Sequence, residues 1–196
     1  MPLPPLPPLA PPLGNALTRW LGRTVLRVAG WRVDGDIPNL RRCVAVLAPH
    51  TSNLDLPLVI ATQLALGLRV NWLGKHTIFR GPLAGLLRRL GGIPVDRRAA
   101  AGTVGQAVAA LTSAPRMFLG LAPEGTRSRV ARWKTGFHRI ATAAGVPIVP
   151  VAVDYPRRAV VIFPPFAPGA DVDADILVLR GYYRPDMGRH PAGYEP

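Results

Sequence analysis

The residues best suited to proton chemistry in this sequence lie in one short connection between two apolar runs. His50 and Asp55 are separated by four residues, and they follow the apolar run 43–48, which predicts a buried strand. In α/β proteins, connections that leave the carboxyl ends of strands carry ligand sites. A neutral histidine there can accept a proton near pH 7, and an aspartate five residues later can orient the ring if the chain turns. The spacing therefore suits a general base with an orienting carboxylate.

The same stretch also has a purely structural interpretation. Ser52 followed three residues later by Asp55 resembles a helix capping box. Pro57 opposes this, because with Ser52 as the N-cap its missing N–H would break a helical hydrogen bond. We therefore expect the helix to begin near Leu54 or Asp55. Spacing alone leaves helix capping and catalysis both open, since His-x4-Asp is a weak signal.

The composition limits the class of protein. The chain has 196 residues, 48% of them hydrophobic, which predicts one domain with a sizeable core and excludes a disordered chain. The formal net charge of +13 indicates a surface attracted to nucleic acid, anionic lipid or phosphorylated substrates. With 7% aromatic residues and no RNP-type motif, we expect no nucleic-acid partner. The single cysteine, Cys43, lies in an apolar run and predicts a buried thiol rather than a nucleophile.

Apolar runs alternate along the chain in a pattern typical of an α/β fold. We expect strands over residues 43–48, 70–73, 93–95, 117–121, 147–153 and 160–163. We expect helices over residues 55–68, 82–90, 102–112, 136–144 and 171–179. Pro147 and Pro150 indicate that their strand is irregular or lies at an edge. The alternation predicts a single domain over residues 34–196, with a mainly parallel central sheet flanked by helices on both faces.

Two segments precede this domain. Residues 1–13 are rich in Pro and Leu, which predicts a polyproline-like or disordered tail. Its prolines exclude a membrane-spanning helix, and it lacks a signal-peptide pattern. Residues 14–33 predict an amphipathic helix in which Arg19, Arg23 and Arg27 form one stripe beside apolar side chains. Such a helix can lie on a membrane surface or pack on the domain, and the sequence leaves both open.

Candidate anion-binding residues follow three further strands. Lys75 and Arg97 each follow a short strand, so both can reach the same edge of the sheet, where two cations suit a phosphate. Lys occurs only at positions 75 and 134 among 24 basic residues. Lys75 is therefore an exception in a chain that otherwise uses arginine. Solvated surface charge is the alternative interpretation. The block Glu124-Gly125-Thr126-Arg127 is either an ordinary turn or a loop that presents Arg127 to an anion while Glu124 holds the loop or the substrate.

In their order, these blocks resemble the glycerophospholipid acyltransferase family of the lysophosphatidate acyltransferase type. The resemblance covers about residues 43–155. The matching positions, in chain order, are His50 and Asp55, then Lys75 with the segment 92–97, then the segment 124–127, and then the segment 146–151. The chain departs from the family at Pro49, where Asn is common, and at Ala122, where Phe is common. Many members carry spanning helices before the domain, and the resemblance here is to a short, peripheral branch.

The resemblance implies a specific chemistry. A fatty acyl group would pass from the thioester of acyl-CoA or an acyl carrier protein to a hydroxyl of a lysophospholipid such as 1-acyl-glycerol 3-phosphate. His50 would be the general base and Asp55 would orient it, with no cofactor, no metal and no covalent acyl-enzyme. The expected substrate-binding residues are Lys75, Arg97, Glu124, Gly125, Thr126 and Arg127, of which the cations would hold the acceptor phosphate.

The expected location is cytoplasmic, peripherally associated with the anionic inner face of a membrane. Two alternatives remain open at this stage. The acceptor could be glycerol 3-phosphate or an aminoacyl lyso-lipid, or the chain could bind anionic lipid without catalysis.

Overall fold

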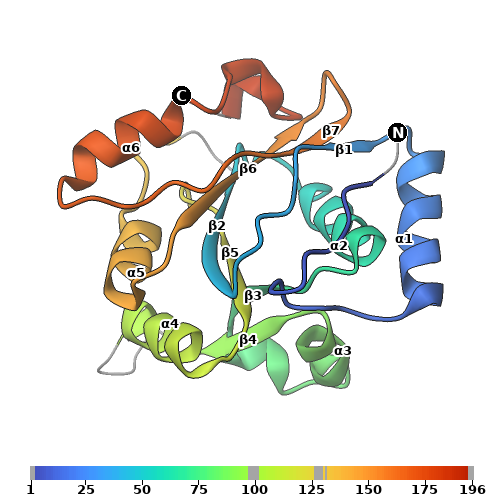
Figure 1. Ribbon diagram of the computed structural model, residues 1–196, viewed down its shortest axis with the longest axis horizontal. Helices are drawn as coiled ribbons and strands as arrows, with labels where there is room; N and C mark the ends of the chain where they lie inside the picture. Colours follow the sequence, from blue (N-terminus) through green and yellow to red (C-terminus); the bar gives the residue numbers. More distant parts are fainter. Residues whose placement is uncertain (1–2, 97–101, 126–129, 131, 194–196) are drawn as a thin grey trace.

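One seven-stranded sheet organises the fold, with helices on both of its faces, as the alternating apolar runs predict (Figure 1). The computed structural model describes residues 3–96, 102–125, 130 and 132–193. The strand order is β1-β7-β6-β2-β5-β3-β4. The strands are β1 Arg32–Asp34, β2 Arg42–Ala48, β3 Val70–Lys75, β4 Gly92–Val95, β5 Met117–Leu121, β6 Ile148–Asp154 and β7 Ala159–Ile162.

The direction of the strands brings separate blocks of the chain to one edge of the sheet. β2 pairs in parallel with both β5 and β6, while β3 pairs in parallel with β5 and β4. Only the pairing of β6 with β7 is antiparallel among the described strands. The loops that follow β2, β3, β4, β5 and β6 therefore open at the same edge, where ligands bind in folds of this kind.

Apart from α1, the helices correspond closely to the ranges expected from the sequence. They are α1 Ala16–Val28, α2 Asp55–Leu66, α3 Ala84–Arg89, α4 Gly102–Ser113, α5 Gly136–Ala144 and α6 Val172–Arg180. None of the helices in the described parts of the chain is long and apolar enough to cross a membrane.

Each face of the sheet packs against its helices through a separate apolar core. Alternate residues of β2 point to opposite faces, so Val44 and Val46 belong to one core and Cys43 to the other. The first core packs the sheet against α4, α5 and Leu179 of α6. The second packs it against α1 and α2 (Figure 1). Cys43 is a free, fully buried thiol, and burial raises its pKa above the ordinary value, as its place in an apolar run indicates.

The N-terminal part of the chain differs from expectation in two ways. The predicted helix over residues 14–33 is too long, because α1 ends at Val28 and Arg32–Asp34 forms the edge strand β1, which the prediction missed. Gly30 adopts a left-handed backbone conformation just after the helix, which glycine allows at little cost and which ends it.

The Pro-rich segment is not a disordered tail over the residues that the structure describes. Residues 3–13 run along the domain with a turn at residues 8–9, and Ala10 is 1% exposed within the second core. The Leu13 N–H donates to the Gly67 carbonyl at 2.7 Å, and the Arg69 N–H donates to the Pro11 carbonyl at 2.9 Å. Apolar contact and backbone hydrogen bonds therefore hold this segment on the domain.

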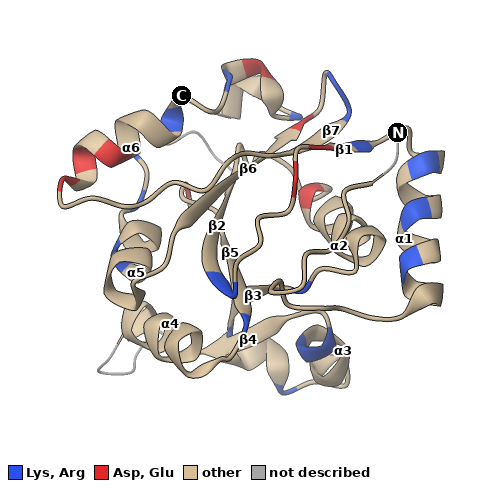
Figure 2. Cartoon of the chain, in the orientation of Figure 1, with Lys and Arg blue, Asp and Glu red and all other residues tan. Residues whose placement is uncertain are grey.

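Helix α1 has one face on the domain and another in solvent. A Cβ added to Gly22 would overlap the backbone of Ala65, so α1 packs closely against α2. On the exposed side, Trp20, Val25 and Val28 are open to solvent beside the arginines of the helix. Figure 2 shows these basic residues as bands along α1. Packing on the domain is therefore observed, and it leaves an apolar surface free.

The prolines of β6 indicated an irregular strand or an edge strand, and β6 is not an edge strand, because it lies between β7 and β2. The ladder with β7 runs from Val151 to Asp154, so it has already ended at Pro150. The Pro150 carbonyl accepts from the Phe163 N–H on that side of the strand. The amide and carbonyl of one strand residue point the same way, so the N–H that Pro150 lacks would face β7 beyond the end of the ladder. Its absence therefore breaks no ladder bond with β7.

Candidate active site

The connection after β2 folds back on itself and brings His50 to Asp55. His50 Nδ1 lies 2.9 Å from Asp55 Oδ2. Helix α2 begins at Asp55, and its N-cap residue, Leu54, makes no side-chain cap. The helix start expected from Pro57 is therefore correct, and Ser52 is not the N-cap. Asp55 lies in the first helical turn, where its carboxylate faces the loop that carries His50.

Three donors surround the Asp55 carboxylate, which is fully buried. Oδ2 also accepts a hydrogen bond from the Ser52 N–H at 3.0 Å, and Oδ1 accepts one from the Tyr155 hydroxyl at 2.6 Å. Burial by itself would raise the pKa of Asp55. The hydrogen bonds from His50, Tyr155 and Ser52 outweigh burial and lower this pKa below its usual value, so Asp55 is ionised at neutral pH.

The ionised carboxylate fixes the proton of the His50 ring. Because Asp55 can only accept at Oδ2, the neutral ring donates from Nδ1 and carries its lone pair on Nε2. The His50 side chain is 18% exposed, and no residue in the described ranges hydrogen-bonds to Nε2. The nitrogen that can accept a proton is therefore the one without a protein partner there.

Glu124 supports the backbone of His50 from the neighbouring strand. It follows β5, is 3% exposed, and its Oε1 accepts the His50 N–H at 3.0 Å. Its other oxygen, Oε2, is buried without a partner among the described residues. Burial raises the pKa of Glu124 to about 7, although the hydrogen bond from the His50 backbone opposes this. Glu124 therefore holds the loop that carries His50 and changes charge near neutral pH.

The expected substrate-binding residues are only partly in view. Lys75 is exposed at the carboxyl end of β3, two strands away from β2, which corresponds to roughly 10 Å across the sheet. Gly125 follows Glu124 in a left-handed conformation. Arg97, Thr126 and Arg127 lie outside the described residues.

Two residues near this edge were not predicted as parts of the site. The Lys134 side chain lies over Gly125, since a Cβ added there would be 2.6 Å from Lys134 Nζ. Lys134 is the other of the two lysines, and that rarity was the available signal. Tyr155 directly follows β6, and its position after a strand end was a signal too. What was lacking was the knowledge that β6 is a neighbour of β2.

A segment close to the C-terminal end covers the outside of the same loop. The His190 N–H donates to Thr51 Oγ1 at 3.3 Å. A Cβ added to Gly188 would lie 2.8 Å from the same oxygen, so glycine permits this close approach. The loop between His50 and Asp55 is therefore packed from α2, from β5 and from the region after α6.

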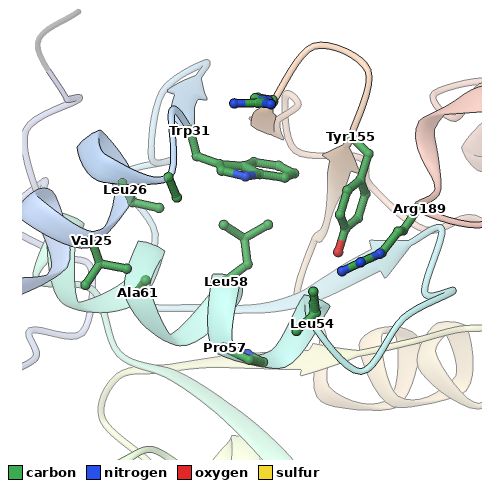
Figure 3. Close-up of a pocket in the computed structure, with 11 residues that line it drawn as sticks. Val25, Leu26, Trp31, Leu54, Pro57, Leu58, Ala61, Tyr155 and Arg189 are labelled. Carbon is green, nitrogen blue, oxygen red and sulfur yellow. The ribbon is translucent and has the colours of Figure 1, made fainter.

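An apolar pocket of about 550 Å³ lies between α1 and α2 beside the site. In Figure 3, Leu58 projects into this pocket beneath Trp31, while Tyr155 and Arg189 close one end with the guanidinium beside the tyrosine hydroxyl. Arg158 also lines the pocket. Tyr155 thus belongs both to the pocket and to the site, because its ring forms a wall of the pocket and its hydroxyl contacts Asp55. An apolar interior with arginines in its lining suits a hydrocarbon chain that carries an anionic group.

A second His–Asp pair lies on the other face of the sheet. His138 of α5 has its Nε2 2.7 Å from Asp175 Oδ2 of α6, and its Nδ1 is 3.4 Å from Thr142 Oγ1. Asp175 Oδ2 also accepts the Gly169 N–H at 2.6 Å. The His138 side chain is 3% exposed. The sequence does not reveal this pair, because α5 and α6 are far apart in the chain.

Comparisons with known proteins agree with one another. A family model described as Acyltransferase matches residues 32–154. The 1-acyl-sn-glycerol-3-phosphate acyltransferases of Salmonella typhimurium and Salmonella typhi are each 37% identical over 128 residues, which is 62% of this chain and 51% of theirs. The chain thus spans about half the length of these curated relatives.

A similar fold is found in the crystal structure of the 1-acyl-sn-glycerophosphate acyltransferase PlsC from Thermotoga maritima. The TM-score is 0.63 at 22% identity, covering 85% of this chain and 75% of that one. The likeness extends to most of the described elements, and the region matched by the family model contains His50, Asp55, Lys75 and Glu124.

Proposed function

This chain belongs to the acyltransferase family, and we propose that it transfers a fatty acyl group from an acyl thioester to a hydroxyl of a lysophospholipid. The proposed acceptor is 1-acyl-glycerol 3-phosphate, which the names of the curated relatives support. The observation that carries the proposal is the 2.9 Å contact between His50 Nδ1 and Asp55 Oδ2, which directs Nε2 of an accessible ring outward at the ligand-binding edge of the sheet.

In the proposed mechanism, Nε2 of His50 takes the proton of the acceptor hydroxyl as that oxygen attacks the thioester carbonyl carbon. A tetrahedral intermediate forms with its negative charge on the former carbonyl oxygen. When it collapses, the C–S bond breaks, and the leaving thiolate recovers the proton from Nε2. Asp55 holds the ring and stabilises the transient imidazolium, which is the role of the carboxylate in a catalytic triad. The substrate hydroxyl is itself the nucleophile, so no acyl-enzyme is required.

The acceptor phosphate is proposed to bind to cations at the same edge. Lys75, Arg97 and Arg127 are the candidates from the sequence, and Lys134 joins them because its ammonium lies over Gly125. The parallel pairing of β2, β5 and β3 supports this assignment for Lys75. Lysine and arginine both suit a phosphate, with arginine able to bind it bidentately.

The pocket between α1 and α2 is the proposed place for a hydrocarbon chain of one lipid substrate. Its volume of about 550 Å³ lies in the range usual for ligand sites, and its lining includes Leu58 and Trp31. A substitution that fills the pocket, Ala61→Leu, should shift the preference toward shorter acyl chains. Competition between acyl donors and acceptors of different chain length would measure this, and an unchanged preference would remove the pocket from the proposal.

Peripheral association with an anionic membrane, at its cytoplasmic face, is part of the same proposal. Its support is the exposed Trp20, Val25 and Val28 of α1 together with the net charge of +13. Val28→Asp should reduce sedimentation with anionic liposomes, whereas Leu177→Asp, at an exposed apolar position on α6, should not. Equal loss in both variants would indicate nonspecific charge attraction.

The direct experiment uses purified protein with acyl-CoA and acyl carrier protein donors. The acceptors would be 1-acyl-glycerol 3-phosphate, glycerol 3-phosphate and aminoacyl lyso-lipids, with products identified by mass spectrometry. We expect diacylated product from 1-acyl-glycerol 3-phosphate, and none from the His50→Ala variant. Product from another acceptor alone would replace the acceptor and keep the chemistry. No product from any pair, with liposome binding intact, would favour a non-catalytic lipid-binding protein.

A further inference from the structure

The far side of the His50–Asp55 pair is closed by a residue 100 positions along the chain. The Tyr155 hydroxyl donates to Asp55 Oδ1 at 2.6 Å, while Oδ2 faces His50 and the Ser52 N–H. The two carboxylate oxygens therefore have different partners. A rotation of the Asp55 carboxylate would break the tyrosine bond and the histidine bond together.

Tyr155 is itself rigidly placed. Its N–H donates to the Met187 carbonyl at 2.9 Å, and its carbonyl accepts from the Arg158 N–H at 3.1 Å. The preceding residue, Asp154, is fully buried and accepts from Arg184 Nη2 at 3.1 Å. The edge of the Tyr155 ring meets Trp31 at 5.1 Å between ring centroids and an interplanar angle of 89°. Backbone and ring are both fixed, so the hydroxyl has a defined direction.

We propose that Tyr155 is a positioning residue of the catalytic dyad, which holds the Asp55 carboxylate so that Oδ2 faces the Nδ1 proton of His50. This inference rests on the proposed function, because it gives the dyad a third member. Tyr155 acts through Asp55 and does not contact the substrate hydroxyl. It orients the carboxylate and, by donating to Oδ1, takes up part of its negative charge.

The surroundings keep Tyr155 a donor over the working pH range. Burial, followed by the bond to Asp55 and the charge of that carboxylate, raises the pKa of Tyr155 above its ordinary value. Arg189 lowers it, but does not reverse the direction. The titratable and charged groups near the dyad and this tyrosine include Glu124, Arg158 and Arg189. None of these replaces the hydroxyl as a donor to Oδ1.

Loss of the hydroxyl has a consequence with a defined sign. Without Tyr155 as a donor, the Asp55 carboxylate carries more uncompensated charge toward His50. The imidazolium is then favoured, so the pKa of His50 rises. Because a general base must be neutral, the acid limb of the rate profile moves to higher pH.

The test is Tyr155→Phe, which keeps the ring, the wall of the pocket and the contact with Trp31. We expect kcat to fall about tenfold, since the lost bond is one to a charged group, while the acceptor KM changes less than about twofold. The matched control is Tyr183→Phe. The buried Tyr183 hydroxyl donates to the Val46 carbonyl at 2.8 Å and not to Asp55. This control should lose stability without moving the acid limb.

A second measurement does not depend on turnover. The His50 ring is titrated by NMR in the wild type and in Tyr155→Phe, with the signal assigned from a His50 variant. A rise in the His50 pKa in Tyr155→Phe, with the expected fall in kcat, supports the proposal. An unchanged His50 pKa, or an unchanged kcat, overturns it. If the wild type transfers no acyl group to any acceptor, the proposed function fails, while a shifted His50 pKa still establishes the contact.

If Tyr155→Phe does not fold, 3-fluorotyrosine at position 155 replaces it. This side chain keeps the hydroxyl and is a stronger hydrogen-bond donor. The pKa of His50 should then move in the opposite direction, to a lower value. A His50 pKa that does not respond to 3-fluorotyrosine overturns the proposal in the same way as an unchanged value in the phenylalanine variant.

Discussion

Two His–Asp pairs among the described residues are hydrogen-bonded, and they differ in the nitrogen that each histidine leaves free. His50 gives its Nδ1 side to Asp55, and no described residue occupies its Nε2. His138 gives its Nε2 side to Asp175, and its Nδ1 faces the Thr142 hydroxyl. The His50 side chain is 18% exposed, and that of His138 is 3% exposed.

These differences suit His50 to accepting a proton and His138 to linking two helices. The neutral His138 ring donates to Asp175 and accepts from Thr142, so both nitrogens are used, and the pair joins α5 to α6. His50 keeps a lone pair toward solvent at the edge of the sheet where parallel strands end. A His–Asp contact is therefore not in itself evidence of catalysis. The free nitrogen and its exposure decide which role the pair can have.

The largest effect is expected from removing each histidine in turn. His50→Gln should lower kcat by at least about a thousandfold, because glutamine cannot take the hydroxyl proton. His138→Gln should leave kcat within about threefold of wild type and lower the melting temperature, because it breaks a buried link between two helices. Steady-state kinetics and thermal melts of both variants measure this. Equal losses of activity would remove the distinction between the pairs.

The two carboxylates provide the next comparison. Asp55→Asn should lower kcat about a hundredfold, because a neutral amide neither stabilises the imidazolium nor fixes the proton on Nδ1. Asp175→Asn should affect stability more than kcat. Near wild-type turnover in Asp55→Asn would show that His50 needs no orienting carboxylate.

Removing an exposed cation near each pair should have different effects on the Michaelis constants. Lys75→Ala should raise the acceptor KM about tenfold, which corresponds to roughly 1.4 kcal/mol, with a smaller change in the donor KM. Arg139→Ala removes an exposed cation beside His138 and should change neither constant. A change confined to the donor KM in Lys75→Ala would assign this lysine to the thioester carrier.

The smallest expected effect is on the pH dependence of stability, and it concerns Glu124. Among the described residues, no carboxylate accepts the His138 N–H as Glu124 accepts the His50 N–H. The Glu124 pKa of about 7 in the folded protein lies above the ordinary value of 4.5, so the folded state binds more protons between these values. The contribution of this group to stability is therefore lost as pH rises from about 4.5 to about 7. Glu124→Gln keeps an acceptor for the His50 N–H and should be more stable than wild type at pH 8, with a smaller difference at pH 5. Melting temperatures that differ equally at both pH values would contradict this assignment.

Local chemistry in the sequence was sufficient to predict the contact between His50 and Asp55 but not its surroundings. The five-residue separation of His50 and Asp55 allows their contact, and Pro57 places the start of α2, so both follow from neighbouring residues. Tyr155 reaches Asp55 only because β6 pairs with β2, and strand order depends on packing across the whole sheet. The pair of His138 and Asp175 likewise depends on how α5 and α6 are placed.

The contacts of the N-terminal region could not be predicted from the sequence either. Proline content predicted a polyproline-like or disordered tail over residues 1–13, whereas the described part is ordered against the domain. It carried no information on what the segment contacts, and Ala10 is buried in the second core. β1 was missed because three residues are too few for a period-2 pattern, and the strand exists through its pairing with β7.

The most direct test of the account is the tautomer of each ring, read from ¹⁵N chemical shifts of histidine side chains at a pH where both rings are neutral. We predict that His50 carries its proton on Nδ1 and its lone pair on Nε2, whereas His138 carries its proton on Nε2. A His50 ring protonated on Nε2 would leave no acceptor toward the substrate and would contradict its role as the general base.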